Sequence, residues 1–210
     1  MPTPSPPPAG DASSSARAAS PPSSLPPPTF APPGRRWRNN VQHQAEYTFC
    51  PHCATRLVYR HLFGRRRQQC PACGWIYFLD PKVGTGVLAE RAGKVVLVRR
   101  GVDPGKGKWC FPSGFVEYDE SPLQAAVREF EEETGLQVNI TGLLNVYHYN
   151  ADFRGPGIMV LYRGEVTGGL PTPMDDVVEV GFFGPEELPE TEIAFESNYR
   201  ALMEWKAAQS

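Results

Sequence analysis

The chain has 210 residues, a formal net charge of −2 and a hydrophobic fraction of 40%. This size permits one globular domain of ordinary size with smaller pieces beside it. The near-neutral balance gives no reason to expect a general nucleic-acid or membrane surface. No apolar run reaches the length of a membrane span or of a secretory signal core. Four of the five cysteines fall in Cys-x-x-Cys pairs, so we expect metal binding in a reducing compartment, the cytoplasm.

The first 46 residues form a low-complexity tail. From residue 1 to about residue 34 they are almost all proline, serine and alanine. Such a segment buries too little apolar surface to offset the entropy of ordering it, so we expect a disordered, inert tail with some polyproline II character. A transit peptide and an SH3-type ligand are the alternatives.

Residues 47–78 carry the two Cys-x-x-Cys pairs, which sixteen residues separate. This spacing matches a zinc ribbon, in which each pair forms a tight knuckle and four thiolates surround one Zn²⁺. The predicted ligands are Cys50, Cys53, Cys70 and Cys73. Four thiolates leave no open position for a substrate, so we expect the zinc to be structural. Two reduced or disulfide-forming pairs are the alternative.

The segment between the pairs predicts a hairpin with strands at residues 58–63 and 68–70. Three consecutive arginines, residues 65–67, fall at its predicted tip. A basic run usually faces water in a turn, and we prefer this interpretation to a contact with phosphate or RNA. We therefore do not expect nucleic acid as a partner.

A larger domain, residues 79–210, is expected to follow. Apolar runs at residues 83–90 and 94–100, separated by Arg-Ala-Gly, predict a β-hairpin. A glycine-rich loop then leads to Gly114, and on the way passes Cys110, which we expect to be a small core residue.

The next stretch predicts a helix with clear ends. Ser121 is a good N-cap, Pro122 suits the first helical position, and Gln124 completes a capping box. Gly135 suits the left-handed residue that ends many helices. Apolar side chains at helical spacing predict the buried face, namely Leu123, Ala126, Val127 and Phe130.

Three glutamates share one face of this predicted helix. Glu129, Glu132 and Glu133 fall at i, i+3 and i+4, where like charges destabilise a helix by roughly 0.2–0.5 kcal/mol per pair. A bound divalent cation is the simplest compensation, because carboxylate oxygens are the ligands that Mg²⁺ prefers. The alternative is a solvated acidic face on a surface helix.

Three further strands and two helices are predicted after this helix. The strands are expected at residues 138–149, 157–166 and 177–183, with a polar linker at 150–156 that we expect to line a cleft. A short helix at 185–188 and an amphipathic helix at 197–207 close the chain. The aromatic residues Trp109, Phe111, Tyr147 and Tyr149 are candidates for stacking on a nucleotide base, with a place in the core as the alternative.

Residues 114–136 resemble the Nudix box, G-x5-E-x7-R-E-U-x-E-E-x-G-U with U apolar, at every defined position. The resemblance implies a Nudix α/β/α sandwich with a mixed curved sheet, preceded here by the small zinc ribbon. It also implies a hydrolase that uses Mg²⁺ or Mn²⁺ to cut a pyrophosphate.

The same resemblance implies a role for each site residue. Glu129, Glu132 and Glu133 would hold metal as catalytic residues, and Glu120 and the Gly114 carbonyl would support them. Arg128 would orient the acidic cluster by ion pairing. Glu179 resembles a late carboxylate of many Nudix domains that adds a metal ligand or a base, with an exposed strand residue as the alternative.

The arrangement of a zinc ribbon before a Nudix domain is similar to that of two groups of enzymes. These are the NADH pyrophosphatases, and the FAD pyrophosphatases with their bacterial relatives. The chain lacks the S-Q-P-W-P-F-P-x-S motif of the first group, whereas its residues 193–197, Ile-Ala-Phe-Glu-Ser, resemble a segment of the second. We therefore expect a nucleotide substrate such as FAD, NADH or ADP-ribose, with release of a nucleoside monophosphate. The alternatives are a nucleotide-sensing regulator whose ribbon contacts nucleic acid, and a ribbon that only packs or forms a homodimer.

Overall fold

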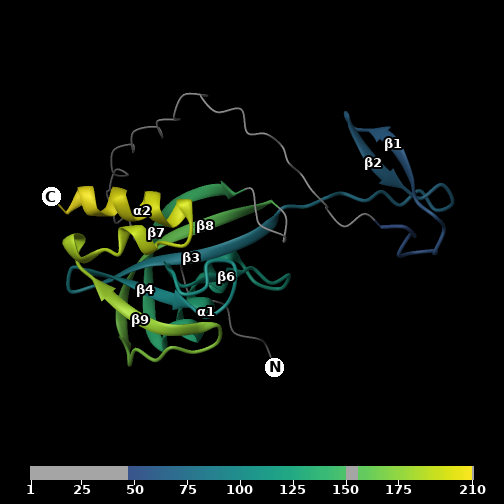
Figure 1. Ribbon diagram of the computed structural model, residues 1–210. Helices are drawn as coiled ribbons and strands as arrows, with labels where there is room; N and C mark the ends of the chain where they lie inside the picture. Colours follow the sequence, from purple (N-terminus) through teal and green to yellow (C-terminus); the bar gives the residue numbers. More distant parts are fainter. Residues whose placement is uncertain (1–46, 150–155, 210) are drawn as a thin grey trace, which may run out of the picture. The chain divides into compact units, whose positions relative to one another are not determined.

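The computed structural model describes residues 47–149 and 156–209 (Figure 1). The predicted tail and nearly all of the predicted linker at 150–156 lie outside these residues. Among the described residues the strands are β1 (Val58–Leu62), β2 (Arg65–Gln69), β3 (Lys82–Arg91), β4 (Lys94–Arg100), β5 (Trp109–Cys110), β6 (Ser113–Phe115), β7 (Leu136–Tyr149), β8 (Gly157–Gly169) and β9 (Val177–Phe183). The helices are α1 (Pro122–Thr134), η1 (Pro185–Glu187), η2 (Glu190–Glu192) and α2 (Glu196–Ala208).

The two Cys-x-x-Cys pairs form matching knuckles. In the first, the Ala54 amide donates to the Cys50 carbonyl at 2.9 Å, and in the second the Gly74 amide donates to the Cys70 carbonyl at 3.1 Å. Ala54 and Gly74 both have left-handed backbones, with φ of 56° and 80°. The repeated geometry brings the cysteine side chains of the two pairs together, and β1 and β2 form the hairpin that joins them.

Strand β2 begins at Arg65 and not at residue 68, so the prediction of an arginine-rich tip was wrong. The turn consists of Phe63 and Gly64, whose φ angles are 51° and 72°. A two-residue turn with positive φ at both positions matches the twist of paired strands, and it leaves all three arginines in the ladder. Gly64 was the local signal for this turn.

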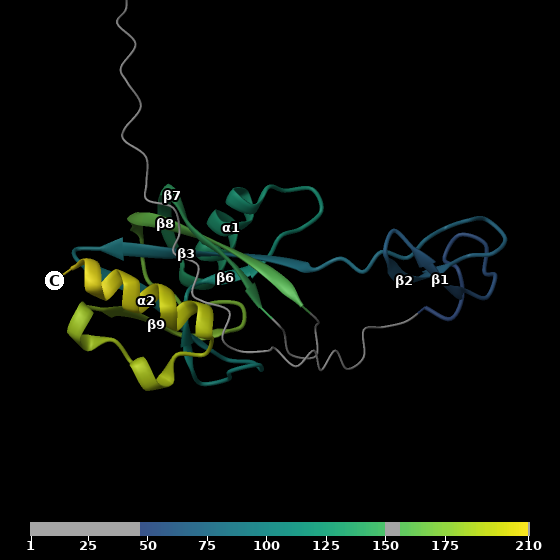
Figure 2. The same cartoon turned by 90° about the horizontal axis from the view of Figure 1, so that it is seen from above.

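The larger domain is built on a mixed sheet with the strand order β5-β4-β3-β8-β7. Strand β3 pairs with β8 in parallel, β6 adds to β3, and β9 adds antiparallel to β4. Helices α1 and α2 lie on opposite sides of this sheet (Figure 2). The predicted α/β/α sandwich with a mixed sheet is confirmed.

Helix α1 starts and stops as its sequence predicts. Ser121 Oγ accepts from the Gln124 amide at 3.3 Å, and Gln124 Oε1 accepts from the Ser121 amide at 2.9 Å, so the capping box is complete. Gly135 has φ 68° and donates its N–H to the Glu131 carbonyl. These caps fix the rotation of the helix and therefore the direction in which each glutamate points.

The buried face of α1 differs from the predicted one. Ala126 and Phe130 are buried as expected, but Leu123 is 46% exposed and Glu133 only 4% exposed. Positions 126, 130 and 133 lie along one stripe of a helix, so the stripe that meets the sheet includes a glutamate. One carboxyl group of the predicted cluster is therefore carried into the interior of the domain.

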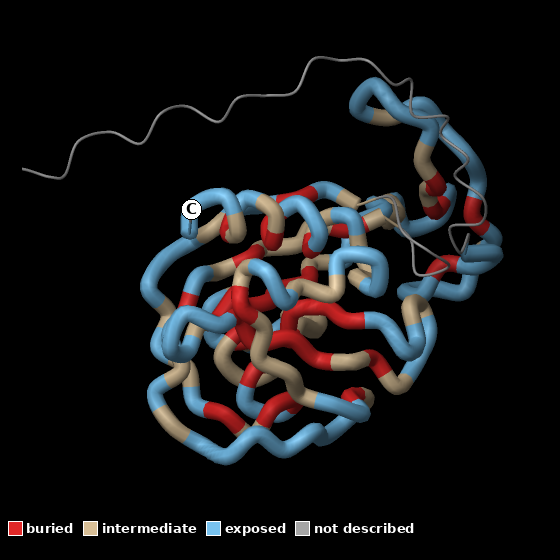
Figure 3. The backbone as a smooth tube through the Cα atoms, turned by 60° about the vertical axis from the view of Figure 1, so that its left-hand side comes forward, coloured by how far each residue is buried: buried red, intermediate tan, exposed pale blue. Residues whose placement is uncertain are grey.

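Helix α2 covers the other face of the sheet. Its Leu202 and Trp205 are buried against Leu97 of β4 and Phe111. Burial of each such side chain contributes roughly 1.5–3 kcal/mol. Figure 3 shows the buried segments gathered in the interior of this domain. The aromatic residues Trp109, Phe111 and Tyr147 are core residues, which supports the alternative to a base-stacking role.

Helix α2 and the segment before it also hold the loop that leads to Gly114. The buried Asn198 side chain accepts a hydrogen bond from the Phe111 amide at 2.8 Å, and the Ala194 amide donates to the Trp109 carbonyl at 2.8 Å. These two hydrogen bonds connect β5 and the residue that follows it to the C-terminal part of the domain. No helix in the described parts of the chain has the length and apolar character needed to cross a membrane.

Candidate active site

Arg128 joins the acidic residues of α1 and of the loop before it. Its Nε donates to Glu120 Oε2 at 3.1 Å, and its Nη1 donates to Glu129 Oε1 at 2.8 Å and to Glu132 Oε2 at 2.9 Å. Its Nη2 donates to the Phe115 carbonyl at 3.2 Å. One guanidinium therefore touches three carboxylates at once, and hydrogen bonding to it lowers the pKa of Glu120. The structure brings Arg128, Glu120, Glu129 and Glu132 together, as the resemblance to the Nudix box implies.

Glu129 lies directly against the backbone of Gly114 in β6. A Cβ atom built on Gly114 would stand 2.1 Å from Glu129 Cδ and 2.2 Å from its Oε1. No residue other than glycine leaves room for this carboxylate. Burial raises the pKa of Glu129, and the charge of Arg128 opposes that shift.

Glu133 is the most buried acid of the cluster. Its Oε2 accepts the backbone N–H of Ser113 at 2.9 Å, which ties the end of α1 to strand β6. Burial raises the pKa of Glu133 to about 9, and the negative charges of Asp176 and Glu129 act in the same direction. In this arrangement the carboxyl group keeps its proton at neutral pH, and a cation placed beside it would favour the charged form.

Two further acids lie near the cluster, and motif reasoning did not select them. The charge of Asp175 raises the pKa of Glu129, and that of Asp176 raises the pKa of Glu133. Asp175 has a left-handed backbone, with φ 54°, and Asp176 faces the buried Arg100, whose Nη2 lies 3.7 Å from its Oδ2. The acidic pair just before β9 was the available signal, but only the fold shows that this loop returns to α1.

Glu179 lies apart from the other predicted site residues. It pairs with Arg99 of β4, with 2.9 Å between Arg99 Nε and Glu179 Oε2. Val95 and Leu97 of β4 pack in the α2-side core, and alternation along the strand puts Arg99 and its partner Glu179 on that same side. The Arg99 guanidinium also lies over the ring of Trp109, at 4.7 Å. The Glu179 side chain therefore lies on the α2 side of the sheet, whereas the glutamates of α1 lie on the other side.

We expect Glu179→Gln to lower kcat/KM for a pyrophosphate substrate by less than about 10-fold, because an exposed ion pair contributes only about 0.2–1 kcal/mol. Steady-state kinetics at saturating Mg²⁺ provide the measurement. A loss of 100-fold or more would instead assign Glu179 to the reacting centre.

The carboxylates fit a divalent cation in their chemistry. Glu129, Glu132 and Glu133 offer only oxygen ligands, which hard cations such as Mg²⁺ take up, and the Glu133 Oε1 atom makes no hydrogen bond within residues 47–149 and 156–209. Among these described residues, however, the four cysteines are the single group whose ligand atoms all lie within 4.8 Å of one another. Glu129 and Glu132 are bonded to Arg128 and Glu133 is bonded to Ser113, so the three carboxylates are not closed into a cage.

The cysteine cluster fits zinc. Cys50 Sγ lies 3.6 Å from Cys73 Sγ, and Cys53 Sγ lies 3.4 Å from Cys70 Sγ. Four sulfurs held tetrahedrally at about 2.3 Å from one Zn²⁺ are separated by about 3.8 Å, close to these distances. Hydrogen bonding to Thr55 lowers the pKa of Cys53 to about 6, whereas the neighbouring cysteine thiols help to raise the pKa of Cys73 to about 12. Metal binding requires the thiolate form of each ligand, so it releases the protons that remain. No disulfide joins these cysteines.

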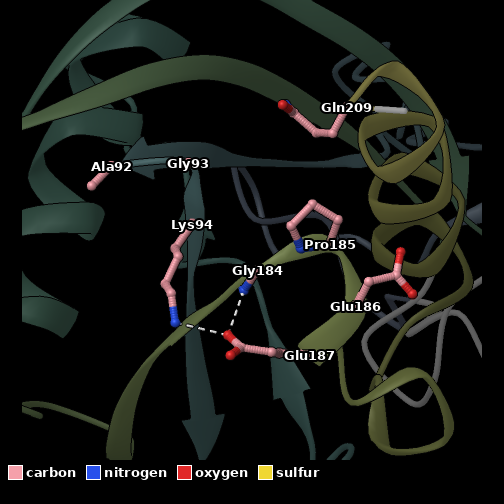
Figure 4. Close-up of a pocket in the computed structure, with 8 residues that line it drawn as sticks. All are labelled: Ala92, Gly93, Lys94, Gly184, Pro185, Glu186, Glu187 and Gln209. Atoms are coloured by element: carbon pink, nitrogen blue, oxygen red, sulfur yellow. Dashed lines mark hydrogen bonds and ion pairs between the residues drawn. The ribbon is translucent and has the colours of Figure 1, made fainter.

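A separate hollow of about 570 Å³ lies at the turn between β3 and β4 (Figure 4). Its lining residues are Ala92, Gly93, Lys94, Gly184, Pro185, Glu186, Glu187 and Gln209. Glu187, Lys94 and Gly184 bond to one another there, since Glu187 Oε2 accepts from Lys94 Nζ at 2.8 Å and from the Gly184 amide at 3.0 Å. None of the predicted site residues lines it, so it has no part in the candidate active site.

Comparison with known proteins identifies the family of this domain. The NUDIX domain model matches residues 80–205. The chain is 36% identical over 130 residues to an ADP-ribose pyrophosphatase of Methanocaldococcus jannaschii, which covers 61% of this chain and 77% of that protein. It is also 30% identical over 147 residues to the NAD-capped RNA hydrolase NudC of Chromobacterium violaceum. That match covers 68% of this chain but only 52% of the NudC protein, so the chain spans about half of this relative.

A solved structure shows the same fold over most of the chain. A Nudix hydrolase from Nitrosomonas europaea superposes with a TM-score of 0.70 at 32% identity, covering 78% of this chain and 92% of that one. The acidic cluster of α1, the family match and these relatives agree. The chain belongs to the Nudix family and is a Nudix pyrophosphohydrolase.

Proposed function

We propose that this enzyme uses a divalent cation, Mg²⁺ or Mn²⁺, to hydrolyse the pyrophosphate bond of a nucleoside diphosphate derivative and release a nucleoside monophosphate. The observation that carries the proposal is the position of Glu129 and Glu133, which α1 turns toward the sheet while Arg128 and Ser113 hold them. In this proposal residues 79–210 form the catalytic domain and residues 47–78 a zinc-bound ribbon.

Each residue of the cluster has a distinct task in this proposal. Glu129, Glu132 and Glu133 bind the cation, with Glu120 and the Gly114 carbonyl as support. When bound, the cation neutralises phosphate oxygens and lowers the pKa of a coordinated water. Arg128 fixes the carboxylates through its bonds to Glu120, Glu129 and Glu132, so that little reorganisation is needed when charge develops on the substrate.

Two further requirements of the reaction are a group that accepts the proton of the attacking water and enough negative charge to attract the cation. A carboxylate of the same cluster accepts the proton of the attacking water. Asp175 and Asp176 add negative charge beside Glu129 and Glu133, which increases the attraction of this region for a cation. Because phosphoryl transfer depends mainly on positioning and charge neutralisation, these groups fit the reaction class.

For the substrate we propose ADP-ribose or a dinucleotide, FAD or NADH. The relative from Methanocaldococcus jannaschii is named for ADP-ribose, and the chain covers 77% of that protein. The NudC relatives act on an NAD-capped RNA by their name, and the chain covers about half of them. These three compounds share an adenylate joined through a pyrophosphate.

The test is a substrate panel. Purified full-length protein is incubated with ADP-ribose, FAD or NADH and Mg²⁺, and products are identified by mass spectrometry. We expect AMP from at least one compound, at a rate that Mg²⁺ controls. Inactivity on all three, in protein whose Mg²⁺ or Mn²⁺ binding has been verified, would contradict the substrate proposal.

A further inference from the structure

The ribbon carries a concentration of positive charge that the net charge of the chain does not reveal. Between Tyr47 and Leu79 there are five arginines and no aspartate, glutamate or lysine, in a chain whose net charge is −2. The arginines are Arg56, Arg60, Arg65, Arg66 and Arg67. No carboxylate in residues 47–149 or 156–209 forms an ion pair with any of them. The net charge of the whole chain gives no reason to expect a nucleic-acid surface, but the ribbon taken alone is strongly positive.

The four arginines of β1 and β2 lie on both faces of the hairpin, because successive residues of a strand point to opposite sides. His61 lies opposite Arg66, and Arg60 lies opposite Arg67. Like charges directly opposite each other destabilise a strand pair. Of the ten residues in β1 and β2, Gln68 is the only buried one, so both faces are accessible. Arg67 is held by its hydrogen bond to the Leu62 carbonyl, and a bound anion would relieve its repulsion with Arg60.

Exposed aromatic rings accompany the arginines. The Arg66 guanidinium lies 4.0 Å from the centre of the Tyr59 ring, and that of Arg67 lies 5.1 Å from the centre of the Phe78 ring. Phe63, at the turn, is 75% exposed and stacks on Phe78, which is 46% exposed, with 6.3 Å between ring centres. Cationic side chains beside solvent-exposed aromatic rings are the combination that binds single-stranded nucleic acid, through phosphates and stacked bases.

We propose that the β1–β2 hairpin binds single-stranded RNA. Arg65 and Arg66 contact phosphates, and the rings of Phe63 and Phe78 stack on bases. A duplex keeps its bases stacked inside and offers nothing to these rings, whereas a single strand offers every base. The choice of RNA over DNA rests on the proposed function, because the proposed substrates are ribonucleotides joined through a pyrophosphate.

The test compares full-length, zinc-loaded protein with variants, using fluorescence anisotropy of a labelled 12-nucleotide RNA of mixed sequence. Arg65→Ala/Arg66→Ala removes two exposed cations that make no hydrogen bond in the described chain, whereas Arg67 is left because its Nη1 donates to the Leu62 carbonyl. We expect at least about 10-fold weaker binding at low salt. The slope of log K against log salt should fall by about 1.4, since each phosphate contact on a single strand contributes about 0.7.

Two further variants separate charge from stacking. Arg91→Ala/Arg163→Ala removes two exposed arginines outside the ribbon and should bind RNA as the wild type does. Phe63→Ala should weaken binding about 10-fold with an unchanged salt slope, because a stacked base and not a phosphate is lost. Zinc content and hydrolysis of the best nucleotide substrate serve as checks that each variant is folded.

Several outcomes would overturn this inference. These are no salt-dependent RNA binding by the wild type, equal affinity of wild type and the Arg65/Arg66 variant, and equal or tighter binding of heparin, duplex RNA or the matching DNA strand. Because RNA binding is measured without turnover, its failure is distinct from failure of the proposed hydrolysis. A protein that binds RNA as described but hydrolyses no nucleotide would contradict only the latter.

Discussion

Replacing Glu133 with glutamine is expected to lower kcat/KM for the nucleotide substrate by about 100- to 1,000-fold. Glutamine keeps the shape of the side chain and an oxygen for the Ser113 amide, so the fold is retained while the charge for a cation is lost. The matched control is Glu131→Gln on the same helix. Glu131 is exposed and its side chain forms no hydrogen bond or ion pair among the described residues, so this variant should keep wild-type kinetics.

The same variant has an expected effect on stability that depends on pH. The pKa of Glu133 is raised by burial to about 9, above its value of 4.5 in an unfolded chain. A group with a raised folded pKa contributes stability that is complete below pH 4.5 and is lost as pH rises toward 9. Without added divalent cation, the wild type should lose stability over this window, and Glu133→Gln should lose less. Parallel pH profiles for the two proteins would contradict the burial of this carboxyl group.

Gly114→Ala is expected to abolish most of the activity with little effect on folding. The new Cβ would stand 2.1 Å from Glu129 Cδ, so the carboxylate must leave its place. The obstacle is the end of a flexible side chain and not backbone, so the free energy of unfolding should change by less than about 1 kcal/mol. Misplacing a catalytic group by about 1 Å costs on the order of 100-fold in rate, and we expect at least that loss.

Gly142→Ala provides the control for this substitution. Gly142 is an exposed residue of β7, and a Cβ atom added to it would meet no other atom within 4 Å. Urea denaturation and kinetics of both variants, measured side by side, separate an effect on the site from an effect on the fold. An active Gly114→Ala enzyme would show that Glu129 does not need its present position.

Local sequence signals were sufficient for most elements. The capping box at Ser121 and Gln124 and the left-handed Gly135 define α1, and apolar runs define strands β4 and β9 with their observed bounds. The resemblance to the Nudix box implied that Arg128 would pair with the acidic cluster, and in the structure Arg128 donates to Glu120, Glu129 and Glu132.

What the sequence could not predict depends on tertiary packing. Apolar periodicity on α1 predicts a buried face with Leu123, but the helix packs on the sheet with Glu133 inward. The return of Asp175 and Asp176 to α1, and the pairing of Glu179 with Arg99 on the other side of the sheet, follow from how β9 pairs with β4. In the ribbon, Gly64 allows a tight turn, so the three arginines predicted at the tip of the hairpin lie in strand β2 instead.

The account depends on the capture of a divalent cation by the glutamates of α1. Titration of the wild type and of a Glu129→Gln/Glu133→Gln variant with Mn²⁺, followed by electron paramagnetic resonance, tests this directly. We predict saturable uptake by the wild type that the double variant loses, while both proteins keep the zinc content of the cysteine cluster. Folded wild-type protein that takes up no Mn²⁺, or a double variant that binds it equally well, would contradict the account.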